Sequence, residues 1–480
     1  MSKKRAAPAD KYGKEEEEEE EKEEKEEKEE KEEETESESE SESEGEEDDG
    51  MWPEMFDMCT HFVREFLEAD PLLIANENFE EPMEQELNEI VAEYLHSSPC
   101  HAIGMRDHMR WTIRFAIQEV LHCYPRRSHP AGDPMPLVNP EANDMAAQIE
   151  YLRSVPQEVQ RTLAWFVKRH KMITGSIFHK AFGSVAVVNS LIYEKAKPLD
   201  VPAEAGGVEE KEKEKEEEKE KEKVGEDVMV VTLAVKGPGM VNTHAATHWG
   251  TKYEQVSVDL YSYAYGTTVE EFGCIPHPEY DFLGASPDGI NVDPTSSRYG
   301  RMLEIKNVVT REITGTPPIA YWIQMQGQME CCGLDACDYL ETKFVEYESR
   351  AQYLADAASA DDLSRNKEGK TTGEMIQFVV PGRGTPHYEY RPLSLRTEEE
   401  VVAWEHAMYD KFTQPPFNYF YSQYQYWKLD VFSCVLVERN RHWFQAALPV
   451  LSRVWQTILH ERVHGYHHRA PQKRKPKIDA

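Results

Sequence analysis

The sequence predicts a mixed α/β domain built around a charged β-hairpin. The hairpin covers residues 284–307, where two strand-like stretches flank a loop rich in turn residues. Helical periodicity before and after it predicts helices around 248–261 and 321–329. The apolar stretches 339–347 and 375–380 predict further strands that extend the same sheet.

The hairpin brings acidic and basic side chains together. A strand leads to Asp288, Pro287 holds the residue before it in an extended conformation, and Gly289 lets the chain bend directly after the aspartate. In the second strand, side chains alternate between the two faces of the sheet, so Glu304 and Lys306 share one face while the leucine and isoleucine beside them share the other. The pairing places Asp288 across from Glu304.

Two carboxylates and an ammonium group at one place suit metal-assisted hydrolysis of a phosphodiester. Adjacent carboxylates repel, and a hard divalent cation relieves the repulsion by oxygen ligation. The bound cation lowers the pKa of a water molecule, and a nearby lysine orients that water or neutralises developing charge. The alternative for Asp288, Glu304 and Lys306 alone is a surface strand with alternating charges, so other motifs must decide.

The acidity of the chain is concentrated in two segments. The 480 residues carry a net charge of −36, with room for about two or three domains. Residues 1–50 hold 26 acidic and 9 basic side chains, a net charge of −17, and residues 206–227 hold 11 and 6, a net charge of −5. The remaining −14 leaves the rest acidic, so any surface for nucleic acid must be a local patch.

Cysteine spacing and hydropathy limit the cellular compartments in which we expect the protein. The eight cysteines include no CxxC pair, and the chain shows no signal peptide and no apolar run of membrane length. We therefore expect reduced thiols in an intracellular protein that is not secreted and has no membrane partner.

Composition divides the chain into four parts. Residues 1–50 predict a disordered acidic tail, because Glu/Lys and Ser/Glu repeats have nothing to bury. Residues 51–145 predict a helical N-terminal region that ends in a Pro-rich connector. Residues 146–465 form the main domain, with an acidic insertion at 203–227, and 466–480 form a basic C-terminal tail.

A basic helix before the main sheet offers an anion site. It carries Trp165 and Arg169 and runs into Thr174-Gly-Ser176, a sequence that can cap the next helix. The N–H groups of a helix N-terminus and a guanidinium beside them can bind phosphate. The alternative is an ordinary helix cap.

Five motifs in order resemble the YqaJ-type viral recombinases, or phage lambda-type exonucleases, a branch of the PD-(D/E)xK nucleases that includes giant-virus members. The resemblance covers about residues 150–350 and, more loosely, 426–464. The separation between Glu254 and Asp288 is typical of the family. The matching motifs are Trp165-x-x-x-Arg169 with Ile173-Thr-Gly-Ser176, Trp249-Gly250 with Glu254, Ser286-Pro-Asp288-Gly289, Glu304-Ile-Lys306, and Tyr321 with Gln324 and Gln326.

The resemblance implies a restriction-endonuclease-like fold, with a central mixed β-sheet flanked by helices and the site at one sheet edge. It implies that Asp288, Glu304 and the backbone carbonyl of Ile305 hold Mg²⁺, with Mn²⁺ as a substitute. Glu254 is then expected on a second ion or a bridging water. Lys306 is expected to position or activate the attacking water.

The remaining motif residues are expected to contact the substrate. The resemblance assigns Gln324 to Lys306 or to the scissile phosphate, and Gln326 to substrate binding. It assigns Arg169 and Ser176, with Trp165 beside them, to the 5′-terminal phosphate.

The implied activity is a Mg²⁺-dependent deoxyribonuclease, a 5′-to-3′ exonuclease that resects linear double-stranded DNA for recombination or replication. Its implied partners are duplex DNA ends, a single-strand annealing protein and further copies of the chain, in the host cytoplasm (a viral factory) or the nucleus. A DNA-end-binding protein on a nuclease scaffold with little turnover remains the alternative.

Two C-terminal features suggest other functions. His460-Glu-x-x-His464 fits the zinc-protease pattern. A protease site needs a third protein ligand, and the short remainder of the chain lacks the spacing that would supply one, so we reject that interpretation. The basic run 473–477 is either a nuclear-localisation signal or an arm that contacts DNA.

Overall fold

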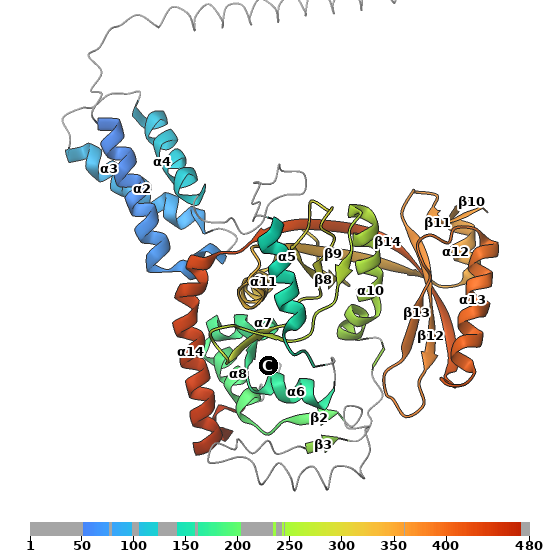
Figure 1. The fold of residues 1–480 in the computed structure, drawn as a ribbon. Helices are drawn as coiled ribbons and strands as arrows, with labels where there is room; N and C mark the ends of the chain where they lie inside the picture. Colours follow the sequence, from blue (N-terminus) through green and yellow to red (C-terminus); the bar gives the residue numbers. More distant parts are fainter. Residues whose placement is uncertain are drawn as a thin grey trace, which may run out of the picture. The chain divides into compact units, whose positions relative to one another are not determined.

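The computed structural model describes most of the chain from Met51 onward (Figure 1). The acidic segments 1–50 and 203–227 and the basic run 473–477 lie outside the described residues, so the predictions for them stay predictions. The described residues are 51–75, 79–97, 105–122, 142–158, 162–202, 234–236, 242, 243, 245–359 and 361–471.

The chain divides into two compact units, Met1–Met58 and Cys59–Ala480. In the first unit, the described residues belong to the start of helix α2 (Met51–Ala69). The second unit continues α2 and adds further N-terminal helices, so the described residues of this region are helical, as predicted. Those further elements are η1 (Pro71–Ala75), α3 (Glu80–Ser97), α4 (Met105–His122) and α5 (Ala142–Ser154).

A seven-stranded mixed sheet forms the centre of the second unit. Its strand order is β13-β12-β14-β9-β8-β7-β4. β8 and β9 run parallel, and the other neighbouring pairs are antiparallel. The predicted mixed α/β class is therefore confirmed. The strands are β4 (Val269–Glu270), β7 (Gly289–Asn291), β8 (Met302–Asn307), β9 (Ala336–Tyr347), β12 (Thr372–Val379), β13 (His387–Tyr390) and β14 (Phe420–Glu438).

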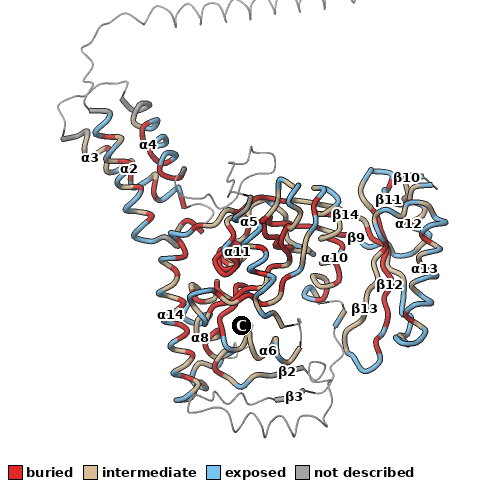
Figure 2. The backbone as a smooth tube through the Cα atoms, viewed as in Figure 1, coloured by how far each residue is buried: buried red, intermediate tan, exposed pale blue. Residues whose placement is uncertain are grey.

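Two helices cover opposite faces of β8. On one face, Leu303 and Ile305 pack against Tyr261 of α10 (Ala246–Tyr265). The other face meets α11 (Ile319–Cys332), which is buried along most of its length (Figure 2). Because side chains alternate along a strand, Glu304 and Lys306 point towards α11, where Gln324 and Gln328 donate hydrogen bonds to Glu304.

A small three-stranded sheet joins two distant parts of the sequence. It has the order β1-β6-β5, with β1 (Ile173–Thr174) parallel to β6 (Leu283–Ala285) and β5 (Ile275–Pro276) on the other side. β1 follows α6 (Leu163–His170) and leads into α7 (Gly175–Phe178). The pairing therefore brings the basic helix beside the start of the β7–β8 hairpin.

The C-terminal helix α14 (Arg441–His464) anchors this region. Arg462 donates hydrogen bonds to the backbone carbonyls of His170 and Lys195, each at 2.8 Å. Lys195 belongs to α8 (Val185–Ala196), which packs against α14.

The remaining elements are η2 (His179–Phe182), β2 (Asp200–Pro202), β3 (Ala234–Lys236), α12 (Arg350–Asp356), β10 (Ala357–Ser359), β11 (Asp362–Asn366), α13 (Glu398–Thr413) and η4 (His467–Arg469).

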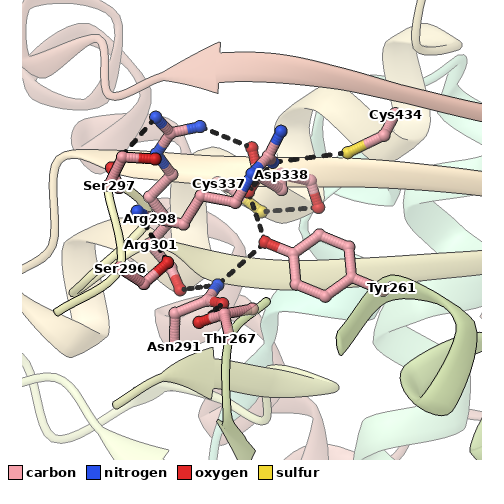
Figure 3. Close-up of polar contacts among 10 residues, drawn as sticks. All are labelled: Tyr261, Thr267, Asn291, Ser296, Ser297, Arg298, Arg301, Cys337, Asp338 and Cys434. Atoms are coloured by element: carbon pink, nitrogen blue, oxygen red, sulfur yellow. Dashed lines mark hydrogen bonds and ion pairs between the residues drawn. The ribbon is translucent and has the colours of Figure 1, made fainter. Parts of the chain in front are cut away.

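A buried polar network fixes the loop between β7 and β8 (Figure 3). Asp338 of β9 is 1% exposed and accepts hydrogen bonds from Arg298, Arg301 (3.1 Å) and Tyr261 (2.5 Å). Asn291 of β7 donates to the Tyr261 hydroxyl (3.0 Å). The two arginines come from the loop and its end, so the buried carboxylate ties the hairpin to both β9 and α10.

A second buried carboxyl group lies between β12 and α13. Glu374 is 1% exposed, and neither of its carboxyl oxygens has a hydrogen-bond donor in the described part of the chain. Burial and the negative charge of Glu405 raise the pKa of Glu374 to about 8, against the opposing effect of Arg391. Glu405 itself accepts a hydrogen bond from Arg350 (2.6 Å). Burial beside Glu405 therefore favours the protonated form of Glu374 at neutral pH.

Within the described residues, no helix is both long and apolar enough to cross a lipid bilayer.

Candidate active site

Asp288 and Glu304 lie opposite each other at the β7–β8 hairpin. Gly289 pairs with Leu303, so the antiparallel register places the residue before Gly289 across from Glu304. The Asp288 Oδ2 atom accepts a hydrogen bond from the backbone N–H of Ile305 (2.7 Å). The predicted pairing is confirmed, although β7 begins one residue after Asp288 instead of leading up to it.

Three side chains donate hydrogen bonds to Glu304, which is 0% exposed. Its Oε1 atom accepts from Lys306 Nζ and from Gln324 Nε2 (2.7 Å), and its Oε2 atom accepts from Gln328 Nε2 (2.7 Å). The Lys306 ammonium also lies 4.8 Å from the centre of the Tyr321 ring. Gln324 therefore contacts the carboxylate of Glu304 and not Lys306, and the other role that the resemblance implied, contact with the scissile phosphate, stays a prediction.

The electrostatics of these groups are strongly coupled. Burial, followed by the negative charge of Glu304, raises the pKa of Asp288 well above its ordinary value, and Lys306 opposes the increase. Burial alone would lower the pKa of Lys306, but the charges of Glu304 and Asp288 outweigh it and raise that pKa. Lys306 is therefore charged. Ionising Asp288 beside the charged Glu304 costs free energy unless a further cation is present.

Glu254 approaches this site from α10. Asn307 of β8 donates to the Gly250 carbonyl (2.9 Å) and accepts from the Ser257 hydroxyl (2.7 Å), which docks the helix on the strand. The charge of Glu254 contributes to the raised pKa of Asp288, so the carboxyl groups act on one another. The structure thus brings the three predicted carboxylates into one electrostatic cluster.

The chemistry of the donors fits a divalent cation. In the described part of the chain, no three His, Cys, Asp or Glu side chains are grouped closely enough to hold a metal by themselves. Mg²⁺ is commonly held by one or two protein carboxylates, with waters and substrate oxygens completing the octahedron. Asp288 and Glu304 supply two such carboxylates at opposite positions of the hairpin. The raised pKa of Asp288 reflects burial and excess negative charge, which a bound cation would offset.

Arg169 forms a second polar site next to the hairpin. Its guanidinium donates to the hydroxyls of Ser286 (3.3 Å), Thr174 (3.2 Å) and Ser176 (3.3 Å). It also lies 4.6 Å from the centre of the Trp165 ring. Burial lowers the pKa of Arg169. Among the described residues its partners are three hydroxyl groups and the Cys274 thiol, so a half-buried cation has no carboxylate partner there, as expected of an anion site.

Both sites lie in one segment that matches a known family. Residues 164–335 match the YqaJ-like viral recombinase domain. The chain contains a YqaJ-like viral recombinase domain. The suspected family resemblance is therefore confirmed.

A relative and two solved structures were also found. Uncharacterized protein R354 of Acanthamoeba polyphaga mimivirus is 29% identical over 242 residues, which is 45% of this chain and 44% of that protein, so the chain spans less than half the length of the relative. Two structures of LHK-Exo, an alkaline exonuclease from Laribacter hongkongensis, one of them in complex with dAMP, cover 63% of this chain and 95% of their own at 17% identity. Their TM-score of 0.32 is too low to establish a common fold.

The start of α7 differs from the prediction that a capped helix N-terminus helps to bind phosphate. Thr174 caps this helix without a side-chain hydrogen bond, and the helix has four residues, Gly175–Phe178. A single turn carries little of the macrodipole that makes a longer helix N-terminus attractive to anions. The helix N-terminus therefore gives little support to the predicted phosphate site, and the Arg169 guanidinium with its three hydroxyls is the observation that remains for it.

Gln326 does not belong to either site. It is 0% exposed, donates to the Glu438 carbonyl (2.8 Å) and accepts from the backbone N–H of Asn440 (2.6 Å). On a helix, residues two positions apart point in nearly opposite directions, so Gln326 faces away from Gln324. The expected role in substrate binding is wrong, and the residue instead ties α11 to the end of β14.

Four site residues were not predicted as such. Gln328 has a sequence signal, because it lies four residues after Gln324 and hence on the same helix face. Thr174 contacts Arg169 from five residues further along the chain, whereas Ser286 contacts it because β1 pairs with β6. Glu341 lies next to Lys306 in the register of the parallel β8–β9 ladder, and no local sequence pattern predicts that register.

Glu341 holds the chain that follows β8. It is 0% exposed and accepts hydrogen bonds from Arg311 and from the Tyr339 hydroxyl (2.8 Å). Arg311 also lies 5.8 Å from the centre of the Tyr321 ring, whose ring in turn faces Lys306. Glu341 and Arg311 therefore help to position the Tyr321 ring beside Lys306.

The His460–His464 motif has a structural role. The two imidazole rings stack with their centres 4.0 Å apart. Glu461 points the other way, is largely buried, and accepts hydrogen bonds from Arg469 (2.9 and 2.8 Å). These contacts fasten the segment after α14 to the helix, in agreement with the rejection of a zinc-protease site.

Proposed function

We propose that the protein is a divalent-metal-dependent deoxyribonuclease that resects linear double-stranded DNA from its 5′ ends. The main support is the convergence of Asp288, Glu304 and Lys306 on one hairpin, inside the segment that matches the YqaJ-like family. The fold we propose for the domain is restriction-endonuclease-like, with this hairpin at the site.

Asp288, Glu304 and the Ile305 carbonyl would hold Mg²⁺ or Mn²⁺, with Glu254 on a second ion or a bridging water. The cation supplies Lewis-acid stabilisation of the phosphoryl oxygens and a water of lowered pKa. Glu304 Oε1 already accepts hydrogen bonds from Lys306 and Gln324, so a cation competes with these donors for that oxygen.

The chain's own groups then divide the remaining tasks. Lys306 is charged and half-buried beside the carboxylates, so its ammonium can donate a hydrogen bond to the attacking water or to the phosphate. The Gln328 side-chain amide donates a hydrogen bond to Glu304 Oε2, which holds that carboxylate in place, and it also donates to the Ser286 carbonyl (3.2 Å). Preorganised donors of this kind stabilise charge without having to reorganise during the reaction.

The second site would bind the 5′-terminal phosphate. Arg169 offers two nitrogens that already donate to hydroxyls, and a terminal phosphate carries more charge than an internal diester. The product would be a 3′ single-stranded overhang for a strand-annealing partner. Trp165 supports the guanidinium from one side.

The decisive experiment compares end-labelled linear duplexes with covalently closed circles, in Mg²⁺ and in EDTA. We expect release of label from the linear substrate in Mg²⁺ only, with the circle left intact. Binding of ends without release of nucleotides in Mg²⁺ or Mn²⁺ would instead identify a DNA-end-binding protein. Cleavage of circles at the same rate would show an endonuclease.

A further inference from the structure

A cavity adjoins the Arg169 site and, among the described residues, none from the β7–β8 hairpin contributes to its lining. Its volume is about 420 Å³. We call it the lysine cavity. Arg169 and Thr174 belong both to its wall and to the hydroxyl cluster described above. The charged and aromatic groups in its lining are Trp165, Phe166, Arg169, Lys180, Lys195 and Lys197, together with His170 and Glu194.

The lysine cavity carries an excess of positive charge. Lys195 Nζ donates to the backbone carbonyl of Arg169 (2.6 Å), a neutral acceptor. Burial, followed by the charges of Arg169 and Arg462, lowers the pKa of Lys195 to about 7. The one carboxylate in the lining, Glu194, pairs with Lys197 (2.9 Å). Cations held close together in a partly buried space attract an anion.

The rest of the lining is apolar or aromatic. Ile177, Leu191, Pro198 and Leu199 contribute aliphatic surface, and the Trp165 indole adds a flat ring. A cavity lined with hydrophobic groups and a few charged ones is typical of small-molecule sites. The combination suits a nucleotide, whose base packs on the apolar wall while its phosphate meets the ammonium groups.

We propose that the lysine cavity binds one additional nucleotide, on the 5′ side of the phosphate held by Arg169. This inference rests on the proposed function. A 5′-phosphorylated strand can then bind in two registers. In the first, its terminal phosphate meets Arg169 and a mononucleotide is released. In the second, the terminal phosphate meets Lys180 and Lys195, the first internal phosphate meets Arg169, and a dinucleotide is released.

The chemistry of the second register is the same hydrolysis, one phosphodiester further along. Water attacks the phosphorus of the second internal phosphodiester, and the bond from that phosphorus to the 3′ oxygen breaks. The 3′ oxygen takes up a proton and leaves on the dinucleotide as a hydroxyl. The remaining strand keeps the phosphorus as its new 5′-phosphate, so it can enter either register again.

The test measures product length from 5′-phosphorylated, internally labelled duplexes in Mg²⁺. The full-length wild-type protein should release both mononucleotides and dinucleotides. Lys180→Ala and Lys195→Met should each lower the ratio of dinucleotide to mononucleotide by about tenfold, the effect of losing a hydrogen bond to a charged group. Lys171→Ala removes an equal charge from an exposed position outside the cavity lining and should leave the ratio unchanged. Mononucleotides alone from the wild type, or an unchanged ratio in both cavity variants, would overturn the proposal.

A binding measurement separates this proposal from the proposed function. In EDTA, the dinucleotide pdApdA should bind the wild type about tenfold more tightly than pdA, and Lys180→Ala should abolish the difference. A protein that binds in this way but releases no nucleotide in Mg²⁺ would refute the nuclease function and keep the cavity site. A protein that hydrolyses DNA but binds pdA and pdApdA equally would keep the nuclease function and refute the cavity site. Melting temperatures of all variants show whether each one folds.

Discussion

Replacing Arg169 by alanine should remove the preference of the protein for 5′-phosphorylated ends. The guanidinium donates to three hydroxyls and, among the described residues, to no carboxylate, so its charge is available to a phosphate. A terminal monoester carries about −1.5 to −2 charges at pH 7, whereas an internal diester carries one. Arg169 should therefore bind a phosphorylated end more tightly than a hydroxyl end.

The magnitude follows from the type of contact. A hydrogen bond to a charged group contributes about 1.5–3 kcal/mol, and about 1.4 kcal/mol corresponds to a factor of ten. Wild-type kcat/KM should be roughly ten- to a hundredfold higher on a 5′-phosphorylated duplex than on the 5′-hydroxyl duplex. Arg169→Ala should lower the first value towards the second. Arg169→Lys keeps the charge without the two-pronged geometry and should retain part of the preference.

The assay uses two linear duplexes that differ only in the 5′ group and are labelled at the 3′ end. Arg453→Ala is the matched control, because it removes an exposed arginine from α14 outside both sites. Its ratio of the two kcat/KM values should equal that of the wild type. An unchanged ratio in Arg169→Ala would refute end recognition by this residue. Equal slowing on both duplexes, with a lower melting temperature, would show that the arginine only supports the fold.

Three further predictions concern the catalytic lysine, the buried carboxyl pair and the acidic segments. Lys306→Ala should lower kcat by at least about a hundredfold, because the ammonium acts on the reacting groups, while duplex binding in EDTA stays near the wild-type level; undiminished turnover would reject the assignment. Glu374→Gln should raise the melting temperature more at pH 8 than at pH 5, since the folded pKa of about 8 lies above the usual carboxyl value and the native protein loses stability as pH rises from about 4.5 to 8. Equal shifts at both pH values would show that Glu374 is not protonated in the fold. Deleting 1–50, or replacing 206–226 with a Gly/Ser linker, should leave the melting temperature nearly unchanged, and the first deletion should tighten DNA binding at low salt; loss of folding would reveal an ordered element in the deleted segment.

The features that the sequence predicted correctly depend on local patterns. The two-residue period of β8 separates Glu304 and Lys306 from Leu303 and Ile305, and the pairing of Gly289 with Leu303 follows from the turn between the strands. The helical periods around α10 and α11 also follow from residues close together in the chain. Short-range sterics and side-chain alternation were therefore sufficient to place the main carboxylates and the lysine.

The features that it missed depend on contacts between distant segments. Ser286 reaches Arg169 because β1 pairs in parallel with β6, a pairing between residues more than a hundred positions apart. Asp338 accepts hydrogen bonds from Arg298 and Arg301 because β9 lies next to β8. The sequence does not predict that these two strands are neighbours. Parallel ladders need long crossover connections, so their register cannot be derived from local turn residues.

One short stretch of chain connects the two sites. The Ser286 hydroxyl accepts a hydrogen bond from Arg169, and Asp288, two residues later, lies across from Glu304. Two residues of extended backbone span about 7 Å, a separation comparable to that of neighbouring phosphates in an extended single strand. Pro287 stiffens the connection between them, since its ring fixes one backbone angle and restricts the residue before it. The distance from the phosphate held at Arg169 to the scissile phosphodiester is therefore set by the backbone of the hairpin and not by a mobile side chain. If the proposed function is correct, cleavage falls one nucleotide beyond the phosphate at Arg169 in either register, and the lysine cavity decides which phosphate of the strand occupies that position.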